Sequence, residues 1–370
     1  MPHKKKTSEK DLLLDFACMI AAKETSTRGI VVGVGDDTAV LRPHPKEDLL
    51  VTADILVENR HFKRAWFTGY ELGWRLAAVN LSDIASMGGR PLYGILSLAL
   101  PDGIPVKYVR EIEQGVRDHL AHYGAAIVGG NVSGIESTLV CDLTLIGACG
   151  KGKAWRRTCR PGKDAIVVVG NLGEARAGLA LLEKSGRRLA GPRARAQKSG
   201  RSLAGQPART EGPLVRAYKS PVPRLDAAHL LAHGSSTRGR GDRTFATAVH
   251  GAIDVSDGFS TDLIHLCEAA RAGCEVDPRA LPVSAALRAY GKRARKNPHS
   301  MALHGGDDYA IILAVDPRQA TSVVVRIEEE LGIPARIVGR FTKKKGRYEL
   351  VQDGRREPFA AGGWDHLTSR

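Results

Sequence analysis

The sequence predicts an α/β protein, with α+β character, made of two domains. Its 370 residues exceed what one hydrophobic core usually organises, since domains most often hold about 100 to 150 residues. Short aliphatic segments alternate with segments whose apolar residues recur at helical spacing. A polar stretch containing glycine follows one aliphatic segment at 150–153. We place the boundary there, between an N-terminal domain at 1–150 and a C-terminal domain at 151–370.

The individual elements follow from residue type and spacing. Short segments rich in aliphatic and β-branched residues predict strands. These segments are Leu49–Val57, Tyr93–Leu100, Leu139–Cys149, Ala165–Gly170 and Tyr309–Val315. The segments 71–88 and 106–124 repeat apolar residues at helical spacing and end on glycine, which predicts helices.

No apolar run reaches the roughly 18 to 20 residues that a membrane span requires. The longest candidate, 12–22, is interrupted by Asp15 and indicates an amphipathic helix instead. No secretory signal follows the basic N-terminus, so we expect a cytoplasmic protein without membrane attachment. The six cysteines show no CxxC pair and no regular spacing, which indicates neither a zinc site nor a disulfide framework.

The formal net charge of +15 is concentrated in one segment. Eight Lys or Arg and no acidic residue lie between Lys184 and Arg209, so more than half of the excess is found there. In this segment KSGRRLAG recurs as KSGRSLAG, and its Gly, Ser, Pro and Arg content predicts a basic, flexible insertion at 184–210. A basic surface attracts any polyanion. Because the charge is local, nucleic acid is not the expected partner.

Aspartates beside small residues recur along the chain. They occur in GVGDDTAVL (33–41), VTADILVENRHF (51–62), VNLSDIA (79–85), AIDVSDG (252–258) and GGDDYA (305–310). Mg²⁺ is usually held by one or two carboxylates together with substrate phosphates and water. Aspartates from several loops can therefore converge on a metal and polyphosphate site. A P-loop, a GxSxG elbow and an HExxH helix are absent from the sequence.

Each motif alone also has a structural interpretation. Gly-Asp-Asp is more often a β-turn than a metal site. Asp54 in an apolar strand and Asp83 on an apolar helix are open to either role, because a charge in such surroundings must be paired or bound to a metal. The aspartates of DVSDG precede a predicted helix, where capping and phosphate binding are compatible. His61 alone is more often a surface or core residue, and Trp364 an anchor of the C-terminus.

Taken in order, these motifs resemble those of the thiamine-monophosphate kinase family, within the superfamily of aminoimidazole ribonucleotide synthetase and selenophosphate synthetase. The resemblance runs from about Gly33 to Trp364 and is carried by GDDTAVL, the strand with Asp54 followed by ENRHF, LGWRLAAVNLSDIASMGG, SLALP, GGNVS, DVSDG and GGDDY. It implies an aminoimidazole ribonucleotide synthetase-like architecture, with an N-terminal mixed sheet and helices that dimerise as a homodimer and a C-terminal α/β domain. It further implies ATP as co-substrate, several Mg²⁺ ions, and phosphoryl transfer to thiamine monophosphate.

The same resemblance implies roles for individual residues. The implied metal ligands are Asp37, Thr52, Asp54, Asp83, Asp254 and Asp257. The implied nucleotide contacts are Gly130, Asn131, Arg156 and Ser256. The implied contacts to thiamine monophosphate are His61, Asp307 and Trp364. Asp54, Asp257 and Arg156 are expected to act directly in phosphoryl transfer.

Some positions depart from the family pattern. Asn131 stands where most relatives have aspartate, and Ala53 replaces a frequent threonine. Asp307 replaces a frequent glutamate, and Glu113 falls where a nucleotide-contacting tyrosine is expected.

Two alternatives stay open. One is another ATP-dependent synthetase or kinase of the superfamily, and the other is a nucleic-acid-binding protein that uses the basic insertion. A selenophosphate synthetase would show a reactive N-terminal cysteine, whereas Cys18 lies in an apolar segment. The hydrogenase-maturation relative would show a C-terminal cysteine, and HLTSR has none.

Overall fold

The computed structural model describes residues 29–32, 38–189, 212–234 and 245–363. The chain divides into two compact units, an N-terminal unit (1–84 with 89–154) and a C-terminal unit (85–88 with 155–370). Asp37, Trp364 and most of the predicted insertion lie outside the described residues. Within those ranges, no helix is both long and apolar enough to cross a membrane.

The N-terminal unit is built on a mixed four-stranded sheet in the order β3-β6-β4-β5. Its strands are β3 (Glu47–Val57), β6 (Val140–Gly150), β4 (Arg90–Pro101) and β5 (Ala126–Ile135). β6 is antiparallel to both β3 and β4, whereas β4 and β5 are parallel. A parallel pair needs a crossover, and α3 (Val106–His122) supplies it. Short pieces precede and follow β3: β1 (Ile30–Val32), β2 (Val40–Leu41) and η1 (Arg64–Trp66).

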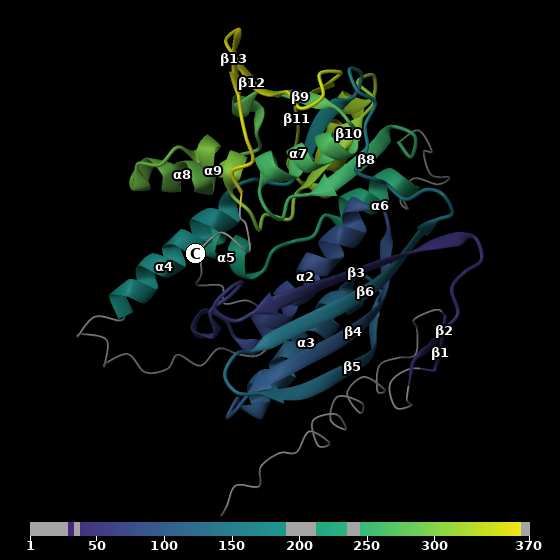
Figure 1. Ribbon diagram of the computed structural model, residues 1–370, viewed down its shortest axis with the longest axis vertical. Coiled ribbons are helices and arrows are strands. Elements are labelled where there is room, and N and C mark those ends of the chain that lie inside the picture. Colours follow the sequence, from purple (N-terminus) through teal and green to yellow (C-terminus); the bar gives the residue numbers. More distant parts are fainter. Residues whose placement is uncertain (1–28, 33–37, 190–211, 235–244, 364–370) are drawn as a thin grey trace, which may run out of the picture. The chain divides into compact units, whose positions relative to one another are not determined.

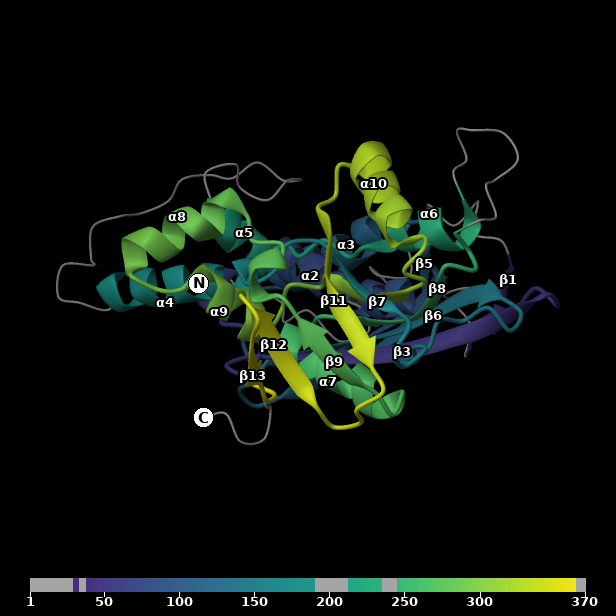
Figure 2. The ribbon, with the colours of Figure 1, turned by 90° about the horizontal axis from the view of Figure 1, so that it is seen from above.

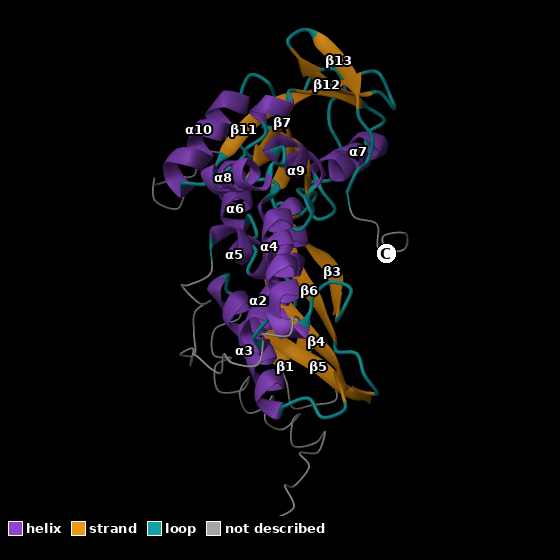
Figure 3. Ribbon diagram, turned by 90° about the vertical axis from the view of Figure 1, so that its left-hand side faces the viewer, coloured by secondary structure: helices purple, strands orange, loops and turns teal. Residues whose placement is uncertain are grey.

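Helices α2 (Gly69–Ser86) and α3 cover one face of this sheet, as Figure 3 shows. They cross at very short range because glycines lie at the contact. A Cβ atom added at Gly73 would lie 1.9 Å from the carbonyl oxygen of Ile112, and one at Gly115 would lie 2.2 Å from that of Tyr70. The close crossing therefore fixes the position of α2, which carries Asp83, against the sheet.

The opposite face of the sheet carries exposed apolar side chains. On β3, Leu49, Val51 and Ile55 are 47%, 68% and 48% exposed, whereas Leu50 and Leu56 point to the covered face and are buried. This alternation is that of a strand with only one face packed within the chain. On β3, the uncovered face is therefore apolar.

The C-terminal unit contains a seven-stranded sheet in the order β13-β12-β9-β11-β7-β10-β8 (Figure 1). The strands are β7 (Ala165–Val169), β8 (Val249–Asp254), β9 (Gly273–Val276), β10 (Ile311–Val315), β11 (Ala335–Thr342), β12 (Tyr348–Gln352) and β13 (Arg355–Pro358). All its pairs are antiparallel except β9 with β12. Every residue of β7 and β10 is buried, so the sheet is covered on both faces at its centre.

Helices on both sides provide that cover. They are α4 (Glu174–Leu189), α5 (Pro213–Lys219), α6 (Leu225–His233), α7 (Phe259–Ala269), α8 (Ala285–Ala294), α9 (Pro298–His304) and α10 (Ala320–Leu331), with the short η2 (Pro278–Ala280). α7 contacts β8 and β9, whereas α10 contacts β7, β11 and α6. The group of α4, α5, α8 and α9 packs together, as Figure 2 shows. α7 begins directly after the acidic end of β8, so its packing on the core fixes the position of that end.

The predicted fold class is confirmed, and each predicted strand and helix of 49–149, 165–170 and 309–315 overlaps an observed one. One boundary differs at the basic insertion. The predicted insertion began at residue 184, but α4 continues to Leu189. Glu, Lys, Leu and Arg are good helix formers, so this part of the segment extends the helix despite its charge.

Candidate functional site

In the N-terminal unit, side chains from β3 and α2 form the first acidic cluster. Thr52 and Asp54 lie on the same face of β3 as buried Leu50, and this face is covered by α2. The hydroxyl of Thr52 donates a hydrogen bond to the Asp83 carboxylate on α2. The main-chain N–H of Asp54 donates to Oδ1 of Asn80 at 3.2 Å, and Asn80 lies about one helical turn before Asp83 on α2. The predicted residues Thr52, Asp54 and Asp83 are thus brought together.

Burial and crowding make this cluster strongly unfavourable for negative charge. Burial raises the pKa of Asp54 from 3.8 to about 7, with further contributions from the carboxylates of Asp83 and Asp142. Burial also raises the pKa of Asp142. Sequence reasoning missed Asp142, although it is an acid inside an apolar strand, the same signal that singled out Asp54. A divalent cation would relieve the repulsion between these groups.

Gly130 and Asn131 are consecutive residues of β5, and each is paired with a residue of β4 across the sheet. Asn131 pairs with Ser97 of β4, which in turn pairs with Asp142 of β6. Asn131 and Asp142 therefore share a row, two strands or about 10 Å apart. Gly130 packs so closely that an added Cβ atom would lie 2.2 Å from the carbonyl oxygen of Leu96. Asn131 is exposed, and its side-chain oxygen accepts the N–H of Val132 at 3.0 Å.

His61 and Glu113 both have structural contacts within the N-terminal unit. Nδ1 of His61 accepts the main-chain N–H of Val57 at 2.9 Å, which closes the turn after β3. Glu113 is buried on α3 and forms an ion pair with Arg117 one turn later, at 2.9 Å. In this chain the Glu113 position is therefore part of the packing of a helix.

The second acidic cluster lies in the C-terminal unit, where β8 ends at Asp254 and α7 begins at Phe259. The turn between them is fixed from within the helix. Asp262 accepts the main-chain N–H groups of Asp257 and Gly258 at 3.1 and 3.0 Å. This carboxylate, on the fourth residue of α7, caps the start of the helix, as acids in the first turn often do.

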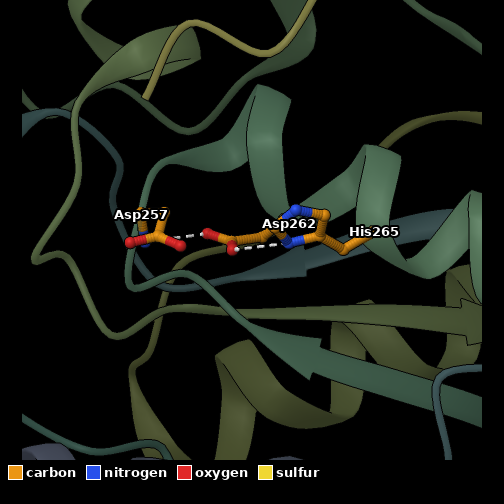
Figure 4. A group of neighbouring side chains, drawn as sticks. All are labelled: Asp257, Asp262 and His265. Atoms are coloured by element: carbon orange, nitrogen blue, oxygen red, sulfur yellow. Dashed lines mark hydrogen bonds and ion pairs between the residues drawn. The ribbon is translucent and has the colours of Figure 1, made fainter. Parts of the chain in front are cut away.

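Figure 4 shows that the side chains of Asp257, Asp262 and His265 point toward one another. One ligand atom from each lies within 4.8 Å of the others, a spacing compatible with a shared cation. Burial raises the pKa of Asp262 to about 8, aided by the carboxylates of Asp254 and Asp257 and opposed by the two N–H donors. Sequence reasoning found Asp254 and Asp257 but not Asp262 or His265.

The GGDDY segment pairs with this turn through its main chain. Asp307 donates its N–H to the carbonyl of Ser256 at 2.7 Å, and Tyr309 donates to that of Val255 at 2.9 Å. Asp307 and Tyr309 have φ values of 66° and 48°, and the Tyr309 hydroxyl donates to the Asp307 carboxylate at 3.1 Å. Non-glycine residues rarely adopt this backbone region, and such strain often accompanies function.

Asp308, the second acid of the pair, has a structural role instead. It is buried and accepts the N–H groups of Gly173 and Ala175 at the start of α4. Burial raises the pKa of Asp308 to about 8. The two acids therefore have different roles: Asp308 caps α4, whereas Asp307 lies beside the Ser256 turn.

Arg156 lies next to β8 through its main chain. Its carbonyl oxygen accepts the N–H of Ala252 at 2.9 Å, two residues before Asp254, and its side chain is exposed. The main chain of Arg156 therefore lies beside β8, two residues before its acidic end.

The donor set of both clusters fits Mg²⁺. The N-terminal cluster offers the carboxylates of Asp54 and Asp83 and the hydroxyl oxygen of Thr52, and the C-terminal cluster offers the carboxylates of Asp257 and Asp262 beside the imidazole of His265. Hard oxygen donors of this kind are what Mg²⁺ prefers. None of the cysteines within the described ranges joins these clusters, since Cys141, Cys149, Cys159, Cys267 and Cys274 are all buried. The arrangement suits chemistry on phosphate groups.

Known proteins resemble this chain along nearly its whole length. The family described as AIR synthase related protein, N-terminal domain, matches residues 35–149. A thiamine-monophosphate kinase of Synechococcus elongatus is 30% identical over 335 residues, covering 90% of this chain and 91% of the relative. The crystal structure of thiamine-monophosphate kinase from Stenotrophomonas maltophilia has a TM-score of 0.74 at 29% identity, covering 94% of this chain and 97% of that one. The structure of AaThiL complexed with AMPPCP and TMP shares the fold, with a TM-score of 0.67 at 24% identity, covering 97% of this chain and 99% of that one.

Proposed function

This chain belongs to the thiamine-monophosphate kinase family, and on that premise we propose that it transfers the γ-phosphoryl group of ATP to thiamine monophosphate, giving thiamine diphosphate and ADP. The observation that carries the proposal is the 30% identity over nine-tenths of both chains. Two clusters of carboxylates whose spacing and crowding are compatible with bound cations support it. An enzyme that transfers a phosphoryl group from one phosphate compound to another needs cations to offset the repulsion between them.

The acceptor atom is an oxygen of a phosphate whose second pKa is about 6, so at neutral pH it is already largely ionised. No strong general base is therefore required from the protein. The main obstacle is the repulsion between two polyanions, and bound Mg²⁺ supplies the neutralising charge. The protein would contribute by positioning the cations and by aligning the acceptor oxygen with the γ-phosphoryl group.

The proposed ligands of several Mg²⁺ ions are Asp37, Thr52, Asp54, Asp83, Asp254 and Asp257. The proposed nucleotide contacts are Gly130, Asn131, Arg156 and Ser256, and the proposed acceptor contacts are His61, Asp307 and Trp364. The raised pKa of Asp54 supports its place in the first set. We add Asp142 to the acidic surroundings of Asp54, since its carboxylate contributes to the same shift.

We also propose a homodimer formed through the N-terminal unit. Its support is the open face of the four-stranded sheet, where Leu49, Val51 and Ile55 are each close to half exposed or more. Exposed apolar side chains grouped on one face of a strand commonly mark an interface. The cytoplasmic location expected from the sequence stays a proposal.

The test is the formation of thiamine diphosphate by the purified full-length protein with ATP and Mg²⁺. Thiamine monophosphate should be converted, whereas unphosphorylated thiamine should not be. Asp83→Asn should lower the rate at least about tenfold, or about 1.4 kcal/mol of barrier. Asp102→Asn, which changes an exposed carboxylate of the same unit, should leave it unchanged.

Failure of the wild-type protein to make thiamine diphosphate would reject the proposed acceptor. ADP formation with a different acceptor would then favour another enzyme of the superfamily. A binding assay with RNA and DNA over a range of salt concentrations tests the nucleic-acid alternative.

A further inference from the structure

The last described residues of the chain lie on the first turn of α7. Gly363 donates its N–H to Oγ1 of Thr261 at 3.0 Å, and Gly362 donates to Oγ of Ser260 at 3.3 Å. Both hydroxyl-bearing residues are buried, with Ser260 0% and Thr261 8% exposed. Ser260 Oγ also lies 3.0 Å from Nδ1 of His304, at the end of α9. Consecutive N–H groups of the C-terminal segment are thus bound by consecutive hydroxyls of the helix.

Glycine is required here by the closeness of the contact. A Cβ atom added at Gly363 would lie 2.1 Å from the carbonyl oxygen of Asp257 and 2.6 Å from Oγ1 of Thr261. One added at Gly362 would lie 2.4 Å from Nδ1 of His304. Neither glycine has a positive φ, so backbone conformation does not explain the pair. Only residues without a Cβ atom allow the segment to lie this close to the Asp257 turn.

The main chain of Asp257 is therefore held from two sides. On one side its N–H donates to the carboxylate of Asp262 at 3.1 Å. On the other side its carbonyl oxygen packs against Gly363. The Asp257 side chain, which is partly exposed, extends from a peptide segment that is contacted on both sides.

We propose that Gly362–Gly363 is a strap that positions the Asp257 turn for binding the Mg²⁺ complex of a nucleoside triphosphate. The inference rests on the proposed function, because it takes Asp257 as a metal ligand. The strap acts through Asp257, and the hydroxyl of Thr261 is its attachment point.

The experiment uses paired variants of Thr261 in the full-length protein. Thr261→Val keeps the shape of the side chain but removes the acceptor of the Gly363 N–H, whereas Thr261→Ser keeps the hydroxyl. The dissociation constant of Mg²⁺·AMPPCP is measured by calorimetry, together with amide exchange of a peptide covering Gly362 and Gly363. Thr261→Val should weaken binding about fivefold or more and speed exchange, as loss of one buried hydrogen bond predicts. Thr261→Ser should remain within about twofold of wild type by the same reasoning.

Gly363→Ala provides a second, stronger perturbation, with an expected loss of affinity of about tenfold or more, because the added Cβ atom must displace the Asp257 carbonyl. Gly212→Ala is its matched control, since a Cβ atom there meets nothing within 4 Å. If Gly363→Ala fails to fold, the Thr261 pair still decides the question.

The strap proposal is overturned if Thr261→Val lowers the melting temperature but leaves the affinity for Mg²⁺·AMPPCP unchanged. That result would mean that the glycines only anchor the C-terminus. Failure of wild type to bind Mg²⁺·AMPPCP would reject the kinase proposal and the strap with it. Normal binding by wild type and by Thr261→Val would reject the strap alone. Weakened binding by Thr261→Val in a protein that makes no thiamine diphosphate would support the strap and reject only the acceptor.

Discussion

Asp54→Asn should have opposite effects on activity and on the stability of the metal-free protein. Asparagine has nearly the same shape as aspartate but carries no charge. The hydrogen bond to Asn80 comes from the main chain of residue 54, so the substitution leaves it in place. What changes is one negative charge beside Asp83 and Asp142.

The magnitude follows from the pKa of Asp54, which burial and its acidic neighbours raise from 3.8 to about 7. At about 1.4 kcal/mol for each pKa unit, the ionised carboxylate costs at most about 4 kcal/mol of folding free energy. Because the side chain is partly accessible to solvent, screening reduces the observable gain to about 1 to 2 kcal/mol. The same substitution should lower turnover at least about tenfold, because one metal-directed charge is lost.

The assay is urea unfolding with EDTA at a series of pH values, run beside melts with added Mg²⁺. The folded protein holds the Asp54 proton more tightly than the unfolded chain, so wild-type stability falls as pH rises from about 4 through 7. Asp54→Asn should match wild type near pH 4 and exceed it above pH 7. Added Mg²⁺ should raise the melting temperature of wild type more than that of the variant.

The reasoning fails if Asp54→Asn is no more stable than wild type at pH 8 in EDTA. It also fails if the stability difference does not depend on pH, since a packing effect would be present at every pH. An unchanged response to Mg²⁺ would remove Asp54 from the metal ligands.

Three further substitutions test other parts of the structure. His119 is buried and stacks on Trp74 at 3.8 Å between ring centroids, and burial lowers its pKa from 6.5 to about 4. Because the unfolded chain takes up this proton first, the free energy of unfolding should fall as pH drops from 6.5 toward 4. Urea unfolding should show a shallower fall for His119→Phe. Gly73→Ala forces a Cβ atom to 1.9 Å from the Ile112 carbonyl and should cost about 2 to 3 kcal/mol of unfolding free energy; a melting temperature equal to that of wild type would contradict the close α2–α3 crossing. Val51→Glu places a charge on the open sheet face, where residue 51 is 68% exposed. The variant should be monomeric in sedimentation analysis without a lower melting temperature, because burying that charge in an interface is costly. An unchanged association state would exclude β3 from the interface.

The sequence alone was sufficient for the order of elements and for most of the acidic residues. β-branched content marked β3 and β7, and glycine-ended apolar periodicity marked α2 and α3, because these patterns depend only on neighbours along the chain. Asp54 was recognisable for the same reason, as a charge within an apolar run. The motif order then indicated the family.

Tertiary structure decided which of these residues work together. Asp142 lies 88 positions from Asp54 in the sequence, and only the pairing of β3 with β6, which sets Asp142 opposite Ile55, brings it near enough to raise the pKa of Asp54. The two acids of GGDDY look alike in sequence, yet one caps α4 and the other lies beside the Ser256 turn. Gly363 reaches Asp257 because β12 and β13 return the chain to the side of α7. Periodicity reports which face of an element is buried, but register and chain return set the distances between residues far apart in sequence.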